Sequence, residues 1–372
     1  HPVEFLAATM TLDMGNTDKL NDFKREAQRL GFIVEIPNVN ESDAEFSVDG
    51  ETIHYALSAV KGVGEQAVND MIAVRPEGGF HDLSDFAARI DPKSINKRML
   101  ENLVSAGAFD CLEENRARVL DAIEQIVAVA NRHHEEKVSG QDDMFSAVTG
   151  PEPIRLKPIA DFEPSDRLSR EQSAIGFYLS AHPLDEHLEM LGKLGAKSWV
   201  SFEEDVKRGS PVGKLGGTII SKQERNTRTG NRMAILQISD PSGQFEAVCF
   251  SETLAQHRDD LEPGSSVVLV VAAEDRPEGV NVRIQAVEPL NKAAANFQGA
   301  LNVFIRDATP ISYIAQQLTP GEYGRGGTVS LFVIDEKSGR EVEVKLKNRF
   351  VLSPKVASAI KQLPGIIDAR LQ

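Results

Sequence analysis

Apolar residues recur every three or four positions through much of the first third of the chain, which predicts helices. The clearest case is residues 116–138, a long amphipathic segment, and residues 52–110 also read as helical between glycine-rich turns. The apolar face of the segment 116–138 consists of Val119, Ile123, Ile126 and Ala130. The periodicity stops from 138 to about 164, where four prolines and few apolar residues indicate a linker.

The first residues predict two further helices and a short strand. The helices flank DMGNTD, and Thr17 or Asp18 is expected to cap the second. FIVEIP then reads as a strand that Pro37 ends. Because the chain opens inside a helical pattern and has no initial Met, we expect it to be a piece of a longer protein.

The pattern changes to strands in the second half. Five segments between residues 211 and 290 predict strands, with a short helix before the fourth: KLGGTIIS, MAILQISD, QFEAVCF, SVVLVVAAED and VNVRIQAVEPL. This order is typical of an OB-type barrel. From about residue 299, the order strand, helix, two or three strands (the last RFVLS), helix and edge strand predicts an α+β sandwich.

Composition is ordinary for a globular chain of two or three domains, with 41% hydrophobic and 26% charged residues over 372 positions. No apolar run approaches the roughly 20 residues of a membrane span. Cys111 and Cys249 lie far apart, which favours a reducing cytoplasm over a disulfide framework. A net charge of -15 lowers the expectation of DNA binding, although an acidic chain can carry a basic groove.

The sharpest motif is LSAVKGVGEQAV, residues 57–68. We expect a helix to end at a turn in which Gly62 and Gly64 bracket Val63, and a second helix to follow. Amides at the start of that helix can bind an anion, and Lys61 adds a positive charge. This is the chemistry of a helix-hairpin-helix, which grips a DNA phosphate without reading bases. The alternative is a packing turn without a ligand.

A second segment, INKRMLENLVSAGAFDCL, repeats this layout at residues 95–112 with a degenerate turn. Its candidate DNA contacts are Lys97, Arg98, Ser105 and Gly107. A helix that ends at a glycine cap, followed by a packing Phe109, explains the same residues equally well.

The segment SKQERNTRTGNR, residues 221–232, is expected to join the first two barrel strands as a loop. It sets four cations against the single acid Glu224: Lys222, Arg225, Arg228 and Arg232. OB folds bind oligonucleotides through this loop and the adjacent sheet, so we predict a weak single-stranded DNA site. Few stacking aromatics accompany it, and a solvated loop is the alternative.

In the linker, QDDMF occupies residues 141–145. Gln141, Asp142 and Asp143 precede two adjacent apolar side chains, Met144 and Phe145, which have no evident core of their own. On these residues alone, the peptide either docks in a pocket of a partner protein or folds back on its own helix.

Catalytic constellations are absent from the sequence. No two Asp residues lie two positions apart, and neither a Gly-x4-Gly-Lys loop nor a Gly-x-Ser-x-Gly elbow occurs. His133 and His134 lie among charged residues, and His182 and His187 do not have the spacing of two zinc ligands on one helix. We expect no catalytic residue, no metal site and no cofactor in this chain.

These pieces, in this order, resemble the C-terminal third of the alpha subunits of bacterial DNA polymerase III along essentially the whole chain. EFLAATMTLDMGNTDKL is similar to the distal fingers, and AVKGVGEQAV and LVSAGAFD to the tandem helix-hairpin-helix region. QDDMF is similar to the internal sliding-clamp motif, and SAIGFYLSAHPLDEH to the helix before the OB domain.

The resemblance implies that the parent is a DNA-directed DNA polymerase, a cytoplasmic nucleotidyltransferase of DNA replication that needs Mg²⁺. Its palm carboxylates are missing here, so this chain should be inactive alone. Gln141, Met144 and Phe145 would enter the clamp (beta subunit), with modest affinity because the motif departs from Gln-x-x-Leu-Phe. The glycine turns would hold duplex DNA, the barrel would lie near the single-stranded template, and the last unit would bind the clamp-loader tau subunit.

The expected fold class is therefore multidomain: mostly α-helical first, then an all-β OB barrel, then a small α+β domain. The expected segments are distal fingers 1–50, tandem helix-hairpin-helix region 51–137, clamp-motif linker 138–165, helical connector 166–208, OB domain 209–291 and tau-binding-like domain 299–372. A stand-alone helix-hairpin-helix and OB module, or an interaction scaffold, is the alternative function.

Overall fold

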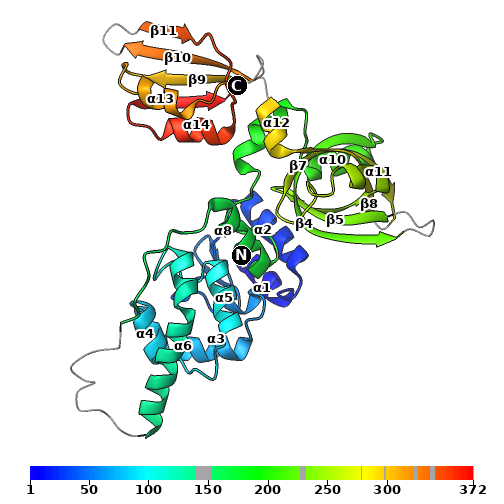
Figure 1. Ribbon diagram of the computed structural model, residues 1–372. Coiled ribbons are helices and arrows are strands. Elements are labelled where there is room, and N and C mark those ends of the chain that lie inside the picture. Colours follow the sequence, from blue (N-terminus) through cyan, green and yellow to red (C-terminus); the bar gives the residue numbers. More distant parts are fainter. Residues whose placement is uncertain are drawn as a thin grey trace. The chain divides into compact units, whose positions relative to one another are not determined.

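The computed structural model of the chain forms two compact units, His1–His182 and Pro183–Gln372 (Figure 1). It describes residues 1–139, 153–226, 232–277, 279–296, 299–321, 326–335 and 340–371. Across these ranges, no helix combines the length and the apolar character that a membrane crossing requires.

The first unit is mostly helical and includes one small sheet. Its helices are α1 (Pro2–Leu12), α2 (Thr17–Arg29), α3 (Glu65–Val74), α4 (Leu83–Arg89), α5 (Lys97–Ala106), α6 (Arg116–Ser139) and α8 (Pro164–Ile175), with a 3₁₀ turn η1 (Leu57–Ala59). Its strands are β1 (Ile33–Val34), β2 (Ser47–Asp49) and β3 (Thr52–His54), in the order β1-β3-β2. One apolar cluster unites these elements, and Phe86 packs edge-to-face against both Phe80 and Phe109.

Three local expectations for this unit are wrong. Asn16, not Thr17 or Asp18, caps α2, because its side chain accepts the Lys19 amide. Residues 52–54 form strand β3 rather than helix, since they pair with β1 and β2 on either side. The segment before the first glycine turn is only the short turn η1, because its backbone bonds to distant segments: the Leu57 amide donates to the Asp43 carbonyl.

The second unit contains a closed five-stranded barrel in the order β4-β5-β6-β8-β7, which confirms the OB-type prediction. The strands are β4 (Val212–Asn226), β5 (Arg232–Asp240), β6 (Gly243–Cys249), β7 (Ser266–Arg276) and β8 (Gly279–Pro289). The helical elements around them are η2 (Asp185–His187), α9 (Leu188–Lys193), α10 (Trp199–Lys207) and α11 (Ser251–Gln256), the last lying between the third and fourth strands as expected.

The unit ends in the expected α+β domain. After α12 (Leu290–Asn296) come β9 (Ala300–Ile305), α13 (Ile311–Gln317), β10 (Thr328–Asp335), β11 (Arg340–Lys345), α14 (Pro354–Lys361) and β12 (Ile366–Leu371). The sheet order is β11-β10-β9-β12, and α13 and α14 lie on one of its faces (Figure 1). The predicted strand RFVLS is wrong, because it makes only isolated bridges at Phe350.

Candidate nucleic-acid interface

The first glycine turn has the backbone geometry of an anion-binding hairpin. Gly62 takes a φ of +74°, which an L side chain rarely adopts, and a Cβ there would lie 3.1 Å from the Asn102 amide nitrogen. Gly64 is the N-cap of α3 and has no side chain to accept that helix's first amides. The amino end of α3 therefore presents uncapped N–H groups and the positive end of its dipole.

Neighbouring helices hold this turn in place. The Lys61 amide donates to the Ala174 carbonyl of α8 at 2.9 Å, and Asn102 Nδ2 of α5 donates to the Lys61 carbonyl at 2.6 Å. Val63 is buried in the core. Because the amide and the carbonyl of Lys61 are both hydrogen-bonded within the protein, the backbone of the turn is held without a ligand.

Lys61 precedes the N-cap of α3 by three residues, and its Cε lies 3.3 Å from a Cβ built at Gly176, at the end of α8. The residue as a whole is exposed, yet partial desolvation by the surrounding protein lowers the pKa of its ammonium group. Burial is the cause of this lowering. A phosphate would relieve the desolvation by supplying a counter-charge.

The second glycine turn is built into the core. Gly107 ends α5 in the left-handed conformation, with φ +91°, and the Ala108 amide donates to the Leu103 carbonyl at 2.9 Å. Phe109, two residues after Gly107, is fully buried. This is the capping geometry that the sequence left open as an alternative to a DNA contact.

Arg116 locks that second turn. Its buried guanidinium binds the Asp110 carboxylate at 2.9 and 2.8 Å and donates to the Ser105 carbonyl at 2.9 Å. A Cβ at Gly107 would lie 2.3 Å from Arg116 Nη2. The Ser105 carbonyl is thus used inside the protein. The sequence pattern did not reveal the roles of Arg116 and Asn102, because Arg116 reaches back to α5 and Asn102 reaches the distant turn at Lys61.

The two cations predicted at the start of α5 are on the surface. Lys97 pairs with Glu124 of α6 at 2.7 Å, and both side chains are well exposed. Arg98 is also exposed. An exposed ion pair of this kind is weak, so Lys97 can exchange Glu124 for another anion at little cost.

In the barrel, the predicted cationic loop is mostly strand. Lys222 and Arg225 lie on β4 and Arg232 begins β5, while Arg228 lies outside the described residues. The Lys222 side chain is only 6% exposed and binds Glu262 at 2.7 Å. Arg225 and Arg232 remain exposed at the end of the β4–β5 hairpin.

Two aromatic residues of the barrel lie in different surroundings. Phe245 is buried and stacks on Trp199, with ring centroids 4.6 Å apart. Phe250 follows β6 directly and is 46% exposed. Of these two rings, only Phe250 can stack on a base from solution. The peptide QDDMF, residues 141–145, lies outside the described residues.

Two family models match the regions described above. A helix-hairpin-helix motif model matches residues 31–119, which include both glycine turns. An OB-fold nucleic acid binding domain model matches residues 214–290, the span of the barrel strands. Among solved structures, the SSB domain of a Synechococcus sp. protein aligns with 21% of this chain and 93% of its own, at 16% identity and a TM-score of 0.20.

Similarity to named relatives runs along the whole chain. DNA polymerase III subunit alpha of Caulobacter vibrioides is 37% identical over 98% of this chain and 32% of its own length. The Vibrio cholerae subunit is 32% identical over 100% of this chain and 33% of its own length. The Escherichia coli K12 subunit is 28% identical over 99% of this chain and 32% of its own length. This chain spans about a third of the relatives' length. Over nearly all its residues, the chain is therefore homologous to the C-terminal third of bacterial DNA polymerase III alpha subunits.

Proposed function

We propose that this chain is the DNA- and partner-handling part of a replicative DNA polymerase. The observation that carries the proposal is the uncapped start of α3 beside Lys61, within a region that matches the helix-hairpin-helix model. Such a site binds phosphate without reading bases, which suits an enzyme that must move along duplex DNA.

The barrel supplies a second contact, to single-stranded DNA. Arg225 and Arg232 are exposed and offer charge, although Arg232 Nη1 lies 3.9 Å from Glu224 Oε2. Phe250 offers a stacking surface, while the Lys222 side chain is nearly buried against Glu262. With one stacking ring, affinity should be weak and strongly salt-dependent.

For the parent protein we propose template-directed DNA synthesis, which its relatives named as the polymerase alpha subunit support. The proposal includes a requirement for Mg²⁺ and a cytoplasmic location, both of which rest on the resemblance alone. We place the clamp contact on QDDMF and the contact to the clamp-loader tau subunit on the last α+β domain. A weak clamp peptide gains effective concentration once duplex DNA is held, and it can still release. This chain alone should extend no primer.

The duplex site is tested by Lys61→Glu, with Arg155→Glu as a matched charge reversal on the exposed segment beside α4. Duplex affinity, measured by fluorescence anisotropy, should fall roughly tenfold for Lys61→Glu, independently of DNA sequence, and stay near wild type for the control. Equal affinities for both variants would remove Lys61 from the site.

The clamp contact is tested by surface plasmon resonance with a purified bacterial sliding clamp. Gln141→Ala combined with Phe145→Ala should lose at least tenfold in affinity, because it removes the amide and one buried anchor. Unchanged binding would show that the clamp recognises another segment, and no binding by wild type would refute the partnership.

A further inference from the structure

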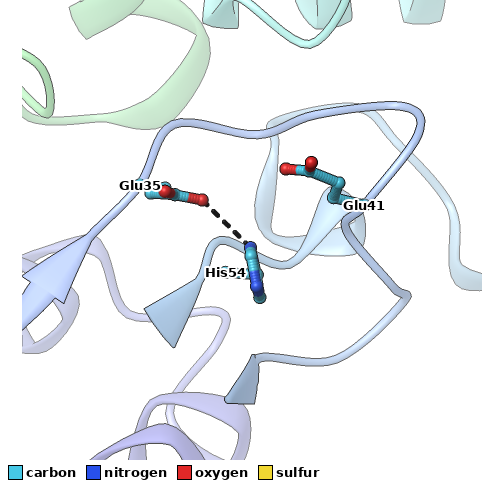
Figure 2. A group of neighbouring side chains, drawn as sticks. All are labelled: Glu35, Glu41 and His54. Atoms are coloured by element: carbon cyan, nitrogen blue, oxygen red, sulfur yellow. Dashed lines mark ion pairs between the residues drawn. The ribbon is translucent and has the colours of Figure 1, made fainter. Parts of the chain in front are cut away.

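Three side chains with metal-ligating atoms converge in the helical unit, away from the glycine turns. Glu35, Glu41 and His54 each place one ligand atom within 4.8 Å of the other two. Figure 2 shows Glu35 and His54 facing each other, with Glu41 on the adjoining loop. Their positions in the sequence follow no regular motif, so the pattern of residues alone did not reveal them.

The small sheet brings Glu35 and His54 together. β1 and β3 run parallel, with Val34 opposite Ile53, and the Glu35 amide donates to the Ile53 carbonyl at 3.0 Å. The next residues along the chain, Glu35 and His54, therefore lie side by side at the same end of the two strands. There, His54 Nδ1 is 3.1 Å from Glu35 Oε2. Ile53 is fully buried, so this edge is fixed by the core.

The third carboxylate comes from an anchored loop. Asn38 Nδ2 donates to Glu41 Oε2 at 3.0 Å, and the Ser42 amide donates to the Asn38 carbonyl at 2.8 Å. The Val39 amide donates to the Ala108 carbonyl at 2.8 Å. After Glu41, the Asp43 carbonyl accepts the Leu57 amide at 2.9 Å, so the loop is tied to the protein on both sides of the exposed Glu41.

The charges around this cluster are unbalanced. Within the described part of the chain, neither Glu35 nor Glu41 pairs with a lysine or arginine, and His54 is the only group that can carry a positive charge between them. A single imidazolium neutralises one carboxylate at most. A divalent cation would neutralise both and would take the imidazole as a neutral ligand.

We propose that Glu35, Glu41 and His54 form a binding site for a divalent transition-metal ion, best suited to Zn²⁺. Mixed imidazole and carboxylate ligands favour zinc over Mg²⁺ or Ca²⁺. In a tetrahedral site with bonds of about 2.1 Å, ligand atoms lie about 3.4 Å apart, so separations within 4.8 Å close by small side-chain rotations. A water molecule completes the fourth position.

The site would fasten the loop at residues 38–43 to the small sheet. That loop also binds the segments of both glycine turns: the Asp43 carbonyl accepts the Leu57 amide, and the Val39 amide binds the Ala108 carbonyl. A bound ion would therefore stiffen the support of both turns. The proposal does not depend on DNA binding, because the ligands are set by the protein alone.

The test is Zn²⁺ binding by the full chain after removal of metal, measured by equilibrium dialysis with elemental analysis. Wild type should bind one equivalent, and Glu41→Gln and His54→Ala should lose at least tenfold in affinity. Glu41→Gln keeps the shape of an exposed side chain, so it guards against misfolding of His54→Ala. His257→Ala is the matched control, because His257 pairs with Asp260 at 3.0 Å and no third ligand joins them among the residues that the structure describes.

A melting-temperature shift supplies the second readout. Zn²⁺ should raise the melting temperature of wild type and of His257→Ala by similar amounts, and that of Glu41→Gln clearly less, because weaker binding stabilises the folded state less. Zinc binding that is equal in all variants would mean adventitious binding only. That result, or no binding by wild type, would overturn the proposal.

Discussion

Two glycines in the helical unit take the left-handed conformation for different reasons. Gly62 opens a turn toward solvent, and its nearest potential clash is the flexible amide of Asn102. Gly107 closes a helix against the buried guanidinium of Arg116, where a methyl group has no room. The same residue type thus forms an exposed turn, the proposed DNA contact, in one case and allows close core packing in the other.

Gly107→Ala should destabilise the helical unit by about 2–4 kcal/mol, from left-handed strain of about 1–2 kcal/mol plus displacement of Arg116. Gly31→Ala is the control, because Gly31 has φ +88° and nothing within 4 Å of a built Cβ, so it should lose only the strain. Urea unfolding measures both. If Gly107→Ala lowers the free energy of unfolding no more than Gly31→Ala does, the Arg116 side chain moves aside without cost.

Among the elements, the start of α10 depends on a carboxylate from the barrel. Asp240 is buried at the end of β5 and accepts the Trp199 amide at 2.6 Å. It also accepts the amides of Ser242 and Gly243, each at 2.8 Å, which close the β5–β6 hairpin. Burial raises the pKa of this carboxyl despite these donors. One side chain therefore joins a helix to a hairpin.

Asp240→Ala should destabilise the second unit by about 2–4 kcal/mol, because it removes a buried carboxylate that accepts the amides of Trp199, Ser242 and Gly243. Ser198→Ala removes only the 3.4 Å side-chain cap of the same helix and should cost about 1 kcal/mol or less. Thermal unfolding of both variants checks the difference. Equal losses would contradict a shared role for Asp240.

At the scale of the whole molecule, the sequence predicts what local patterns determine. The order of the barrel strands and of the last domain was readable because alternation, turns and short helices are local signals. Other contacts join residues that are far apart in sequence: Lys222 pairs with Glu262, Asn102 donates to the Lys61 carbonyl, and Glu41 lies near His54. No periodicity carries such contacts, so these parts of the candidate sites needed the structure.

The two compact units should have separable DNA preferences, since the hairpin turn lies in one and the barrel in the other. The affinities of Lys61→Glu and of Arg225→Ala/Phe250→Ala for duplex and for single-stranded DNA, measured at equal salt, test this separation. We expect the first variant to lose about tenfold in affinity for duplex alone, and the second to lose several-fold for the single strand alone. Equal losses of both variants on both substrates, or no loss, would contradict it.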